Sequence, residues 1–177
     1  MSGPDSPLSD ETLMDQVRDG SVDAYAALFD RHRAALYGYA LRMAQRPEVA
    51  EEVFQDTFLR VFRARGTWSS RDASFRSWLY RIATNAVRDR ARQAARRPEH
   101  LTDEEPDLPF TEAPEERLAL GHALAQLPEN LREAFWLGAV VGLDHHELAE
   151  ALAITPDNAR ARVSRARARL RELLEEQ

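Results

Sequence analysis

The chain has 177 residues, enough for one domain or two small ones, and its 44% hydrophobic and 31% charged content is typical of a globular protein. It contains no Cys, which excludes disulfides, thiolate zinc sites and cysteine nucleophiles and fits a reducing compartment. No apolar run approaches membrane-spanning length and the first residues lack a signal-peptide pattern, so we expect a cytoplasmic protein without membrane insertion.

The net charge of −6 conceals a strong segregation of charge along the chain. Residues 60–97 contain eleven Arg and two Asp, and residues 157–171 contain six Arg and one Asp. Between them, residues 98–116 contain eight acids and neither Lys nor Arg. Two basic blocks separated by an acidic one predict two polyanion-binding surfaces with a repelling segment between them.

Apolar residues at helical spacing predict the first elements of the chain. We expect a short helix at about 9–18, a second from Ser21 or Asp23 to about Arg46, and a third over 50–63, with Pro47 at its opening turn. His32 falls on the apolar face of the second helix with no visible partner. We interpret it as a partly buried structural residue rather than a ligand.

The helix over 50–63 carries more apolar surface than one core face needs, and acids stand beside that surface. The apolar arc consists of Val53, Phe54, Phe58, Leu59, Val61 and Phe62. Excess apolar surface mixed with acids is typical of a face that docks a partner protein. The alternative is a helix packed on two sides within a small bundle.

A long helix is expected over 74–97, with Ser74 as its N-cap. The apolar stripe of this helix is narrow. Along one side of the stripe, an aromatic residue, Arg residues and an Asn follow one another at spacings of three and four residues. The stripe is Phe75, Leu79, Ile82 and Ala86, and the flank is Trp78, Arg81, Asn85, Arg88 and Arg92. Arg and Asn suit phosphates and base edges, and an aromatic ring can stack on an exposed base. A solvated face of an ordinary amphipathic helix is the alternative.

The loop before that helix, residues 63–74, contains Gly66, three Ser and an exposed-looking Trp68. A Trp among Arg residues is a candidate stacking surface, and it could equally plug the end of the bundle.

Residues 98–116, with four Pro, eight acids and little periodicity, predict a linker. We therefore expect an all-α protein of two small helical domains. The N-terminal bundle spans 1–97, the acidic flexible linker spans 98–114, and a four-helix domain with a helix-turn-helix spans 115–177.

In the C-terminal domain we expect helices at about 115–126 and from Pro128 to Gly142. A capping box follows at Asp144 and Glu147, and the turn ITPD leads into the last helix. The buried stripe of that helix is Ala159, Val163, Ala166, Leu170 and Leu173. Arg residues flank the stripe on both sides, and the face pointing away is small: Ala161, Ser164 and Ala168. This pattern favours a recognition helix in a DNA major groove over a terminal coiled-coil helix.

Sequence motifs for catalysis or metal binding are missing. His145 and His146 are adjacent and make a poor metal pair, and we find no phosphate loop, nucleophile elbow or paired buried acids. We expect no metal, no cofactor and no enzymatic activity.

Four segments in register resemble the extracytoplasmic-function sigma factors of bacteria. They are AEEVFQDTFLRVF, FRSWLYRIATN, LPENLREAFWL and the closing VSRARARLREL. The resemblance covers about residues 9–176. It implies a specificity subunit that directs core RNA polymerase to promoters and initiates transcription, and that is commonly restrained by an anti-sigma protein.

The resemblance also implies roles for particular residues. Segment 50–62 would dock on the clamp helices of the polymerase β′ subunit through Glu52, Gln55, Asp56, Phe58 and Phe62. The helix over 74–92 would read the −10 element as a single strand, beside a loop that takes a flipped-out base, through Trp68, Arg71, Trp78, Arg81, Asn85, Arg88 and Asp89. The last helix would read the −35 element as a duplex, while its domain rests on the β flap, through Arg160, Arg162, Ser164, Arg165 and Arg167.

Two departures from the family pattern affect the −35 reader. The turn at Ala153 lacks the usual Gly, and the recognition helix opens on Asp157, Asn158 and Ala159 instead of Gly-Thr-Val. Other functions stay open on residues alone: a stand-alone helix-turn-helix regulator of transcription, and an interaction protein whose Arg residues bind acidic partners.

Overall fold

The computed structural model describes residues 8–96 and 115–175 of the chain. Within these two ranges the regular structure is helical, which confirms the all-α prediction. The first group of helices is α1 (Asp10–Arg18), α2 (Val22–Ala44), α3 (Pro47–Arg63) and α4 (Phe75–Arg96). The second is α5 (Glu115–Gln126), α6 (Glu129–Phe135), α7 (His145–Leu152) and α8 (Pro156–Glu175). The predicted linker at 98–114 lies outside the described residues.

Local capping signals set where the helices begin. The Ser9 side chain accepts from the Thr12 amide at 3.1 Å, and Ser21 accepts from Ala24 at 3.2 Å. Ser74 accepts from the Ser77 amide at 3.1 Å, which confirms it as the cap of α4. Each such cap contributes about 1 kcal/mol to helix stability. Pro47 opens α3 at a position where its missing N–H costs little.

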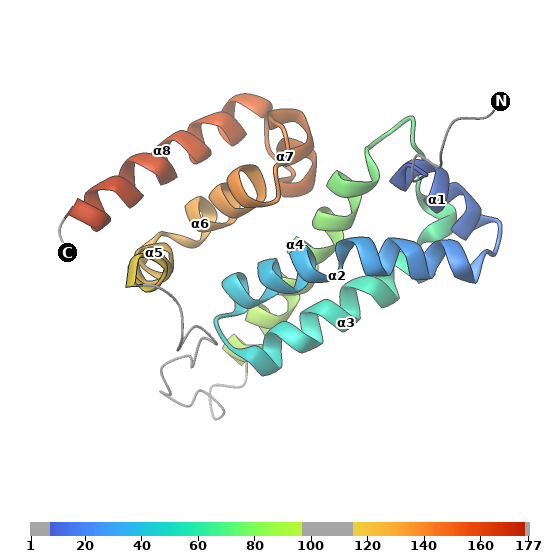
Figure 1. Cartoon of the computed structure of the whole chain (residues 1–177), viewed down its shortest axis with the longest axis horizontal. Coiled ribbons are helices and arrows are strands. Elements are labelled where there is room, and N and C mark those ends of the chain that lie inside the picture. The colour runs from blue at the N-terminus through green and yellow to red at the C-terminus, as the bar shows by residue number, and fades with distance from the viewer. Residues whose placement is uncertain (1–7, 97–114, 176–177) are drawn as a thin grey trace.

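The N-terminal group packs α2 against α3 and α4, with α1 across α2 (Figure 1). Of the predicted stripe on α4, Phe75, Leu79 and Ala86 are fully buried and Ile82 is half-buried. Opposite them, α2 contributes Leu36 and Tyr39, also fully buried. Burial of each large apolar side chain contributes about 1.5–3 kcal/mol, so this face is a main source of stability.

A segment of unusual backbone links α6 to α7 in the C-terminal group. Helix α6 continues into a π-helical turn, Trp136–Val140 (η3), and Gly142 ends that segment at φ 80°, where glycine is favoured. Asp144 and Glu147 form the predicted capping box at the start of α7. The predicted stripe of α8 is buried at every position: Ala159, Val163, Ala166, Leu170 and Leu173.

The two groups of helices touch each other. Helix α7 lies against α4, and α6 lies against α2 (Figure 1). One apolar core runs from the N-terminal group into α6, α7 and the start of α8. A second, smaller core lies between α5 and the C-terminal half of α8. Nothing in the sequence predicted this contact.

Candidate nucleic-acid interface

Helix α4 presents part of its predicted polar flank to solvent. Arg81 and Asn85 are exposed and lie one turn apart, and Arg92 is exposed two turns beyond Asn85. Their direction is set by the opposite face of α4, which is buried in the bundle core. A guanidinium and an amide on one exposed edge can together reach a phosphate and a base edge.

Two other residues predicted to contact the −10 element, Arg88 and Asp89, are already engaged. Arg88 Nη2 lies 3.3 Å from Glu133 Oε2 of α6. Asp89 is bound on both oxygens, at 2.8 Å by Arg60 and at 2.9 Å by Arg92. Burial lowers the pKa of Arg60, but its hydrogen bonds to Asp89 and Asp56 outweigh burial and raise the pKa overall. Asp89 therefore ties α4 to α3 in this conformation.

The two tryptophans assigned to base stacking are buried. Trp68 is 3% exposed and Trp78 is 5% exposed, and both rings pack against Phe75 with centroids 6.5 and 6.2 Å apart. Of the two interpretations of Trp68, the exposed stacking surface is wrong and the ring that plugs the end of the bundle is confirmed. Arg71 beside it is exposed. In this conformation neither ring offers a face on which a base can stack.

The apolar arc of α3 is divided between the core and solvent. Phe58 is 4% exposed and packs on Tyr25 and Phe29, so the sequence-based expectation that it faces a partner is wrong in this conformation. Phe62 is 42% exposed and Leu59 is 51% exposed. Leu59 was part of the predicted apolar arc of this helix, but it was not among the residues predicted to contact core polymerase.

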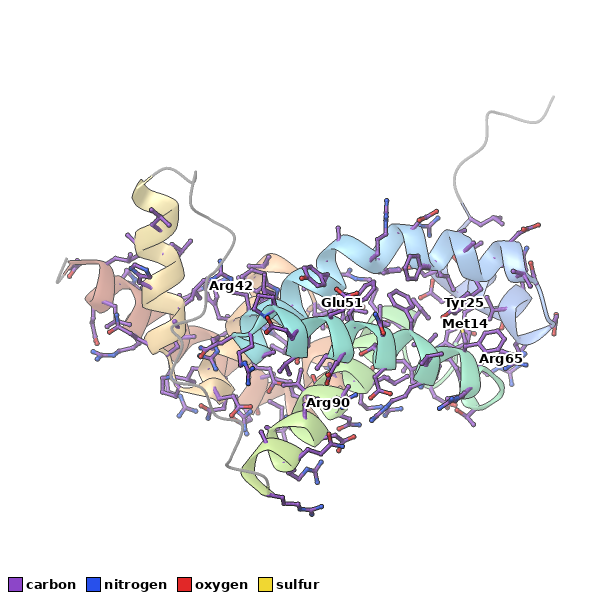
Figure 2. The ribbon with its side chains drawn as sticks, turned by 90° about the horizontal axis from the view of Figure 1, so that it is seen from below. Met14, Tyr25, Arg42, Glu51, Arg65 and Arg90 are labelled. Carbon is purple, nitrogen blue, oxygen red and sulfur yellow. The ribbon has the colours of Figure 1, made fainter. Side chains whose placement is uncertain are left out.

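Polar side chains surround that exposed pair on α3. Arg65 stands over the Phe62 ring with its guanidinium carbon 4.3 Å from the centroid, at the end of α3 (Figure 2). The predicted polar contacts are all within ion pairs or hydrogen bonds: Glu52 with Arg90 at 3.2 Å, Gln55 with Glu51 at 3.0 Å, and Asp56 with Arg60 at 2.8 Å. The result is an apolar patch with a charged border, the usual anatomy of a protein interface.

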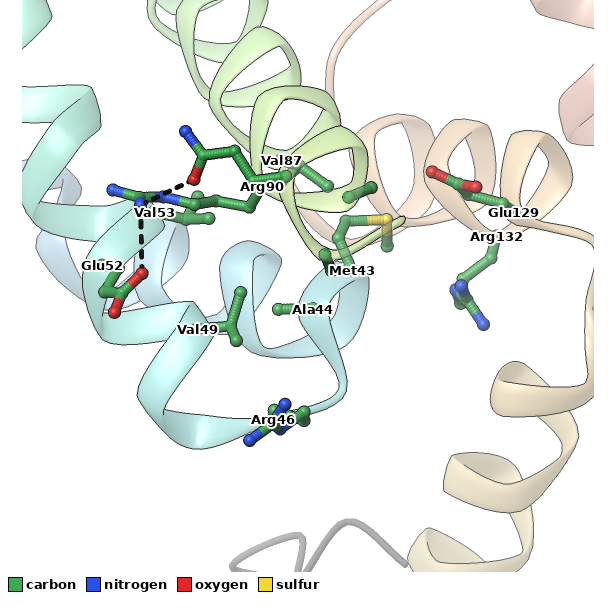
Figure 3. A pocket seen from close by; sticks show the side chains of 13 residues that line it. Met43, Ala44, Arg46, Val49, Glu52, Val53, Val87, Arg90, Glu129 and Arg132 are labelled. Carbon is green, nitrogen blue, oxygen red and sulfur yellow. Dashed lines mark hydrogen bonds and ion pairs between the residues drawn. The ribbon is translucent and has the colours of Figure 1, made fainter. Parts of the chain in front are cut away.

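A cleft of about 390 Å³ adjoins this border, between the end of α2, the start of α3, the second half of α4 and α6. Met43, Val49 and Val87 form much of its apolar wall, and the pair of Glu52 and Arg90 stands at its edge (Figure 3). Sequence reasoning missed this cleft because its walls come from four helices.

The outer face of α8 is the second basic surface. Arg160, Ser164, Arg165 and Arg167 are exposed, as predicted for a recognition helix, while Arg162 is half-buried and donates to Asn158 Oδ1 at 3.3 Å. Thr155 supplies the start of this helix, since its hydroxyl accepts from the Asn158 amide at 3.2 Å. The departures at 157–159 therefore leave the helix start intact.

His32 is 8% exposed and has a partner that the sequence did not reveal. Its Nε2 lies 2.7 Å from Asp10 Oδ2, on α1. Burial raises the pKa of Asp10, but hydrogen bonds and charges from His32 and Arg31 outweigh burial and lower it overall. This agrees with a structural histidine. Within residues 8–96 and 115–175, no cluster of three or more potential metal ligands is present. No helix in the described part of the chain is long and apolar enough to cross a membrane.

Comparisons with known proteins cover both halves of the chain. Residues 28–97 match the family Sigma-70 region 2, and residues 117–170 match Sigma-70, region 4. RNA polymerase sigma factor CarQ of Myxococcus xanthus is 37% identical over 168 residues, which cover 92% of this chain and 96% of CarQ. ECF RNA polymerase sigma factor SigM of Mycobacterium tuberculosis is 34% identical, over 94% of this chain and 85% of SigM.

A solved structure shows the same arrangement of helices. CnrH, in complex with the cytosolic domain of CnrY, matches with a TM-score of 0.74 and 30% identity, over 95% of this chain and 98% of CnrH. The matches span both groups of helices, so they do not support a stand-alone regulator built on the helix-turn-helix alone. With its two sigma-70 regions and a relative 37% identical along nearly its full length, the chain belongs to the extracytoplasmic-function family of RNA polymerase sigma factors.

Proposed function

We propose that this sigma factor divides its work between the two predicted domains. Residues 1–97 bind core RNA polymerase and the −10 element, residues 115–177 bind the −35 element, and the acidic segment 98–114 connects them. The observation that carries the proposal is the exposure of two basic helix faces, on α4 and on α8, together with an exposed apolar patch on α3.

Core polymerase binds the patch of Leu59 and Phe62 on α3. The acids beside it, Glu52 and Asp56, give the patch the polar border that sets orientation and specificity. The clamp helices of the β′ subunit are the partner that the family resemblance implies, and the C-terminal domain then rests on the β flap.

Promoter DNA is read in two forms. Arg81 and Asn85 on α4 bind the −10 element as a separated strand, and the exposed Arg residues of α8 bind the −35 element as a duplex. Unstacking a base costs a few kcal/mol, and contacts to the captured strand offset that cost. Promoter opening therefore needs no nucleotide hydrolysis by this protein, which acts as a specificity subunit and not as an enzyme.

A protein partner that restrains the factor is part of the proposal. CnrH was solved in complex with the cytosolic domain of CnrY, and the family resemblance implies an anti-sigma protein as the restraining partner of this chain. The polymerase is in the cytoplasm, so we place the active factor there.

Run-off transcription tests the proposal, with purified core polymerase on a pool of genomic fragments, with and without this protein. We expect new, discrete start sites that weaken with Arg81→Ala and Asn85→Ala. Loss of one base-edge contact costs about 1–3 kcal/mol, or roughly 5- to 150-fold in promoter use. Arg33→Ala, an exposed Arg on α2, is the matched control and should leave start sites unchanged. Binding to core polymerase without any new start site would contradict the proposal.

A further inference from the structure

The C-terminal group covers the face of α4 that adjoins the proposed strand-binding edge. At about 100° per residue, Ser77 and Arg88 lie within roughly 40° of Arg81 around the axis of α4. Ser77 is 1% exposed because α7 lies on it, whereas Arg81 is exposed. The covered face and the exposed edge are thus neighbouring strips of one helix surface.

Carboxylates occupy the donors on this covered strip. Ser74 Oγ donates to Glu147 Oε1 at 2.8 Å, and Ser77 Oγ donates to Glu150 Oε2 at 2.7 Å, both across the contact between α4 and α7. The second carboxylate oxygen of Glu147 accepts from the backbone amide of Asp144, the N-cap of α7, at 3.1 Å. The capping box of α7 therefore holds this carboxylate in place.

A third carboxylate reaches the same strip from α6. Glu133 is 5% exposed, and it accepts from Tyr39 Oη at 3.1 Å and from Arg88 Nη2 at 3.3 Å. The Tyr39 hydroxyl is also 2.9 Å from Thr84 Oγ1 on α4. Ser, Thr, Tyr and Arg side chains are the groups with which proteins usually bind DNA phosphates. On α4, Ser77 and Arg88 face protein carboxylates.

Apolar and backbone contacts complete the junction. The buried core continues from α2 and α4 into α6 and α7. Arg76 Nη2 donates to the Val141 carbonyl at 2.6 Å, just beyond η3. At Gly38 on α2, an added Cβ would lie 3.7 Å from the Trp136 ring, an ordinary contact distance, so a methyl group fits there but a longer side chain would meet the ring.

We propose that the C-terminal group is an internal competitor of the promoter strand: Glu133, Glu147 and Glu150 hold the donors of α4 in place of DNA phosphates, and the two groups of helices must separate before α4 can capture DNA. In the closed state Arg88 is bound to Glu133, and a strand on Arg81 and Asn85 would run beside the carboxylates of α7. Like charges repel it there. The inference rests on the proposed role of α4 in strand binding.

A bulky substitution at Gly38 tests whether the two groups must separate, and it changes no residue that we assign to DNA or polymerase binding. Gly38→Gln places a long side chain where Trp136 packs, and Ala35→Gln makes a similar change on the exposed face of the same helix. Since the chain has no Cys, dyes can be attached at Ala27→Cys and Glu175→Cys, both exposed, to follow separation of the groups by energy transfer.

We expect Gly38→Gln to lower energy transfer and to tighten binding of a fluorescent, mixed-sequence single-stranded oligonucleotide, while Ala35→Gln matches the parent chain. If the open form is near 10% of the parent population, the gain in affinity reaches about tenfold. Glu150→Ala is a second route to the same result, with Glu172→Ala, an exposed acid on α8, as its control.

Unchanged energy transfer in folded Gly38→Gln and Glu150→Ala variants overturns the proposal. So does clear separation of the groups with no gain in oligonucleotide binding. Run-off transcription by the same variants with core polymerase keeps the two proposals apart. Suppose that the variants still direct new start sites while their energy transfer and oligonucleotide binding match the parent chain. That result would support the sigma function and contradict only the internal competition by the C-terminal group.

Discussion

Ala153 ends α7 in the left-handed region, at φ 54° and ψ 47°. A residue with a Cβ in this region costs roughly 1–2 kcal/mol, which is why glycine is common at this position of a helix end. The turn between α7 and α8 thus stores strain at a single residue, next to the proposed −35 reader.

Ala153→Gly should relieve this strain. We expect the free energy of unfolding to rise by about 0.5–1 kcal/mol, since the greater freedom of glycine in the unfolded chain offsets part of the gain. Urea denaturation measures it. Ala168→Gly, at an exposed position inside α8, should lower stability by about 1 kcal/mol. Equal losses in both variants would contradict a strained Ala153.

Asp10 makes stability depend on pH through His32 and Arg31. Its pKa is lowered below the ordinary 3.8, so its contribution is complete above that value and is lost as the pH falls through the lowered pKa. Asp10→Asn should cost about 1–2 kcal/mol at neutral pH, and the gap to the parent chain should narrow below pH 3.8. Denaturation across acidic pH measures this.

The control for Asp10 is Asp19→Asn, an exposed Asp at the end of α1. It should track the parent chain at each pH. A gap for Asp10→Asn that stays constant down to the most acidic pH would show that packing, rather than the charge of Asp10, accounts for the loss.

At the scale of elements, α3 is divided between a buried apolar face and an exposed apolar edge. Its inner face, with Val53, Phe58 and Val61, is buried in the bundle, and its outer edge leaves Leu59 and Phe62 exposed. The structure therefore confirms that α3 packs within the bundle. Apolar surface also remains outside the bundle, and its use as a docking face stays a prediction.

Leu59→Ser and Phe62→Ser test the outer edge of α3. Each removes exposed apolar surface, so we expect weaker binding to core polymerase, by about 1–3 kcal/mol. Leu59→Ser should change folding stability little, whereas Phe62→Ser also loses the contact of its ring with Tyr25 and should lower stability. Surface-immobilised core polymerase provides the measurement. Val22→Ser, 74% exposed at the start of α2, is the control and should bind normally. Full affinity in both α3 variants would place the polymerase contact elsewhere.

At the scale of the whole molecule, Glu133 is buried at the contact between the two groups of helices, and the proposed separation of the groups would expose it to water. Burial raises the pKa of Glu133 above the ordinary 4.5. The charge of Arg88 and the hydrogen bond from Tyr39 lower this pKa, and the charge of Glu129 on the same helix raises it, so the pKa stays raised overall. An acid whose pKa rises on closure takes up protons as the molecule closes. Closed packing is therefore favoured below pH 4.5 and weakens as the pH rises through the raised pKa.

Energy transfer between the dyes on α2 and α8 should fall as the pH rises through this range. Glu133→Gln cannot titrate and should lose this part of the pH dependence, whereas Glu172→Gln, an exposed acid on α8, should retain it. Identical pH profiles for the parent chain and Glu133→Gln would show that Glu133 does not control closure.

The sequence by itself determined where helices start and stop and which face of each is apolar. Ser74 caps α4 as predicted, Ser21 caps α2 as one of its two predicted candidates, and the stripe of α8 is buried at all five places. These signals are local: a cap hydrogen bond spans three residues, and a helical stripe follows from 3.6 residues per turn. The family resemblance depends on the same local patterns in register.

Only the tertiary structure decided how much of each face is covered. Periodicity gives the direction of a side chain from the helix axis, but not the number of neighbours it meets. Trp68 and Trp78 are therefore buried where exposure was expected, and Phe58 is buried while Phe62 is not. The contact of Ser77 with Glu150 joins residues 73 positions apart and has no local signature. The stability of such a contact depends on the whole interface between the two groups of helices, and no single segment of the sequence encodes that interface.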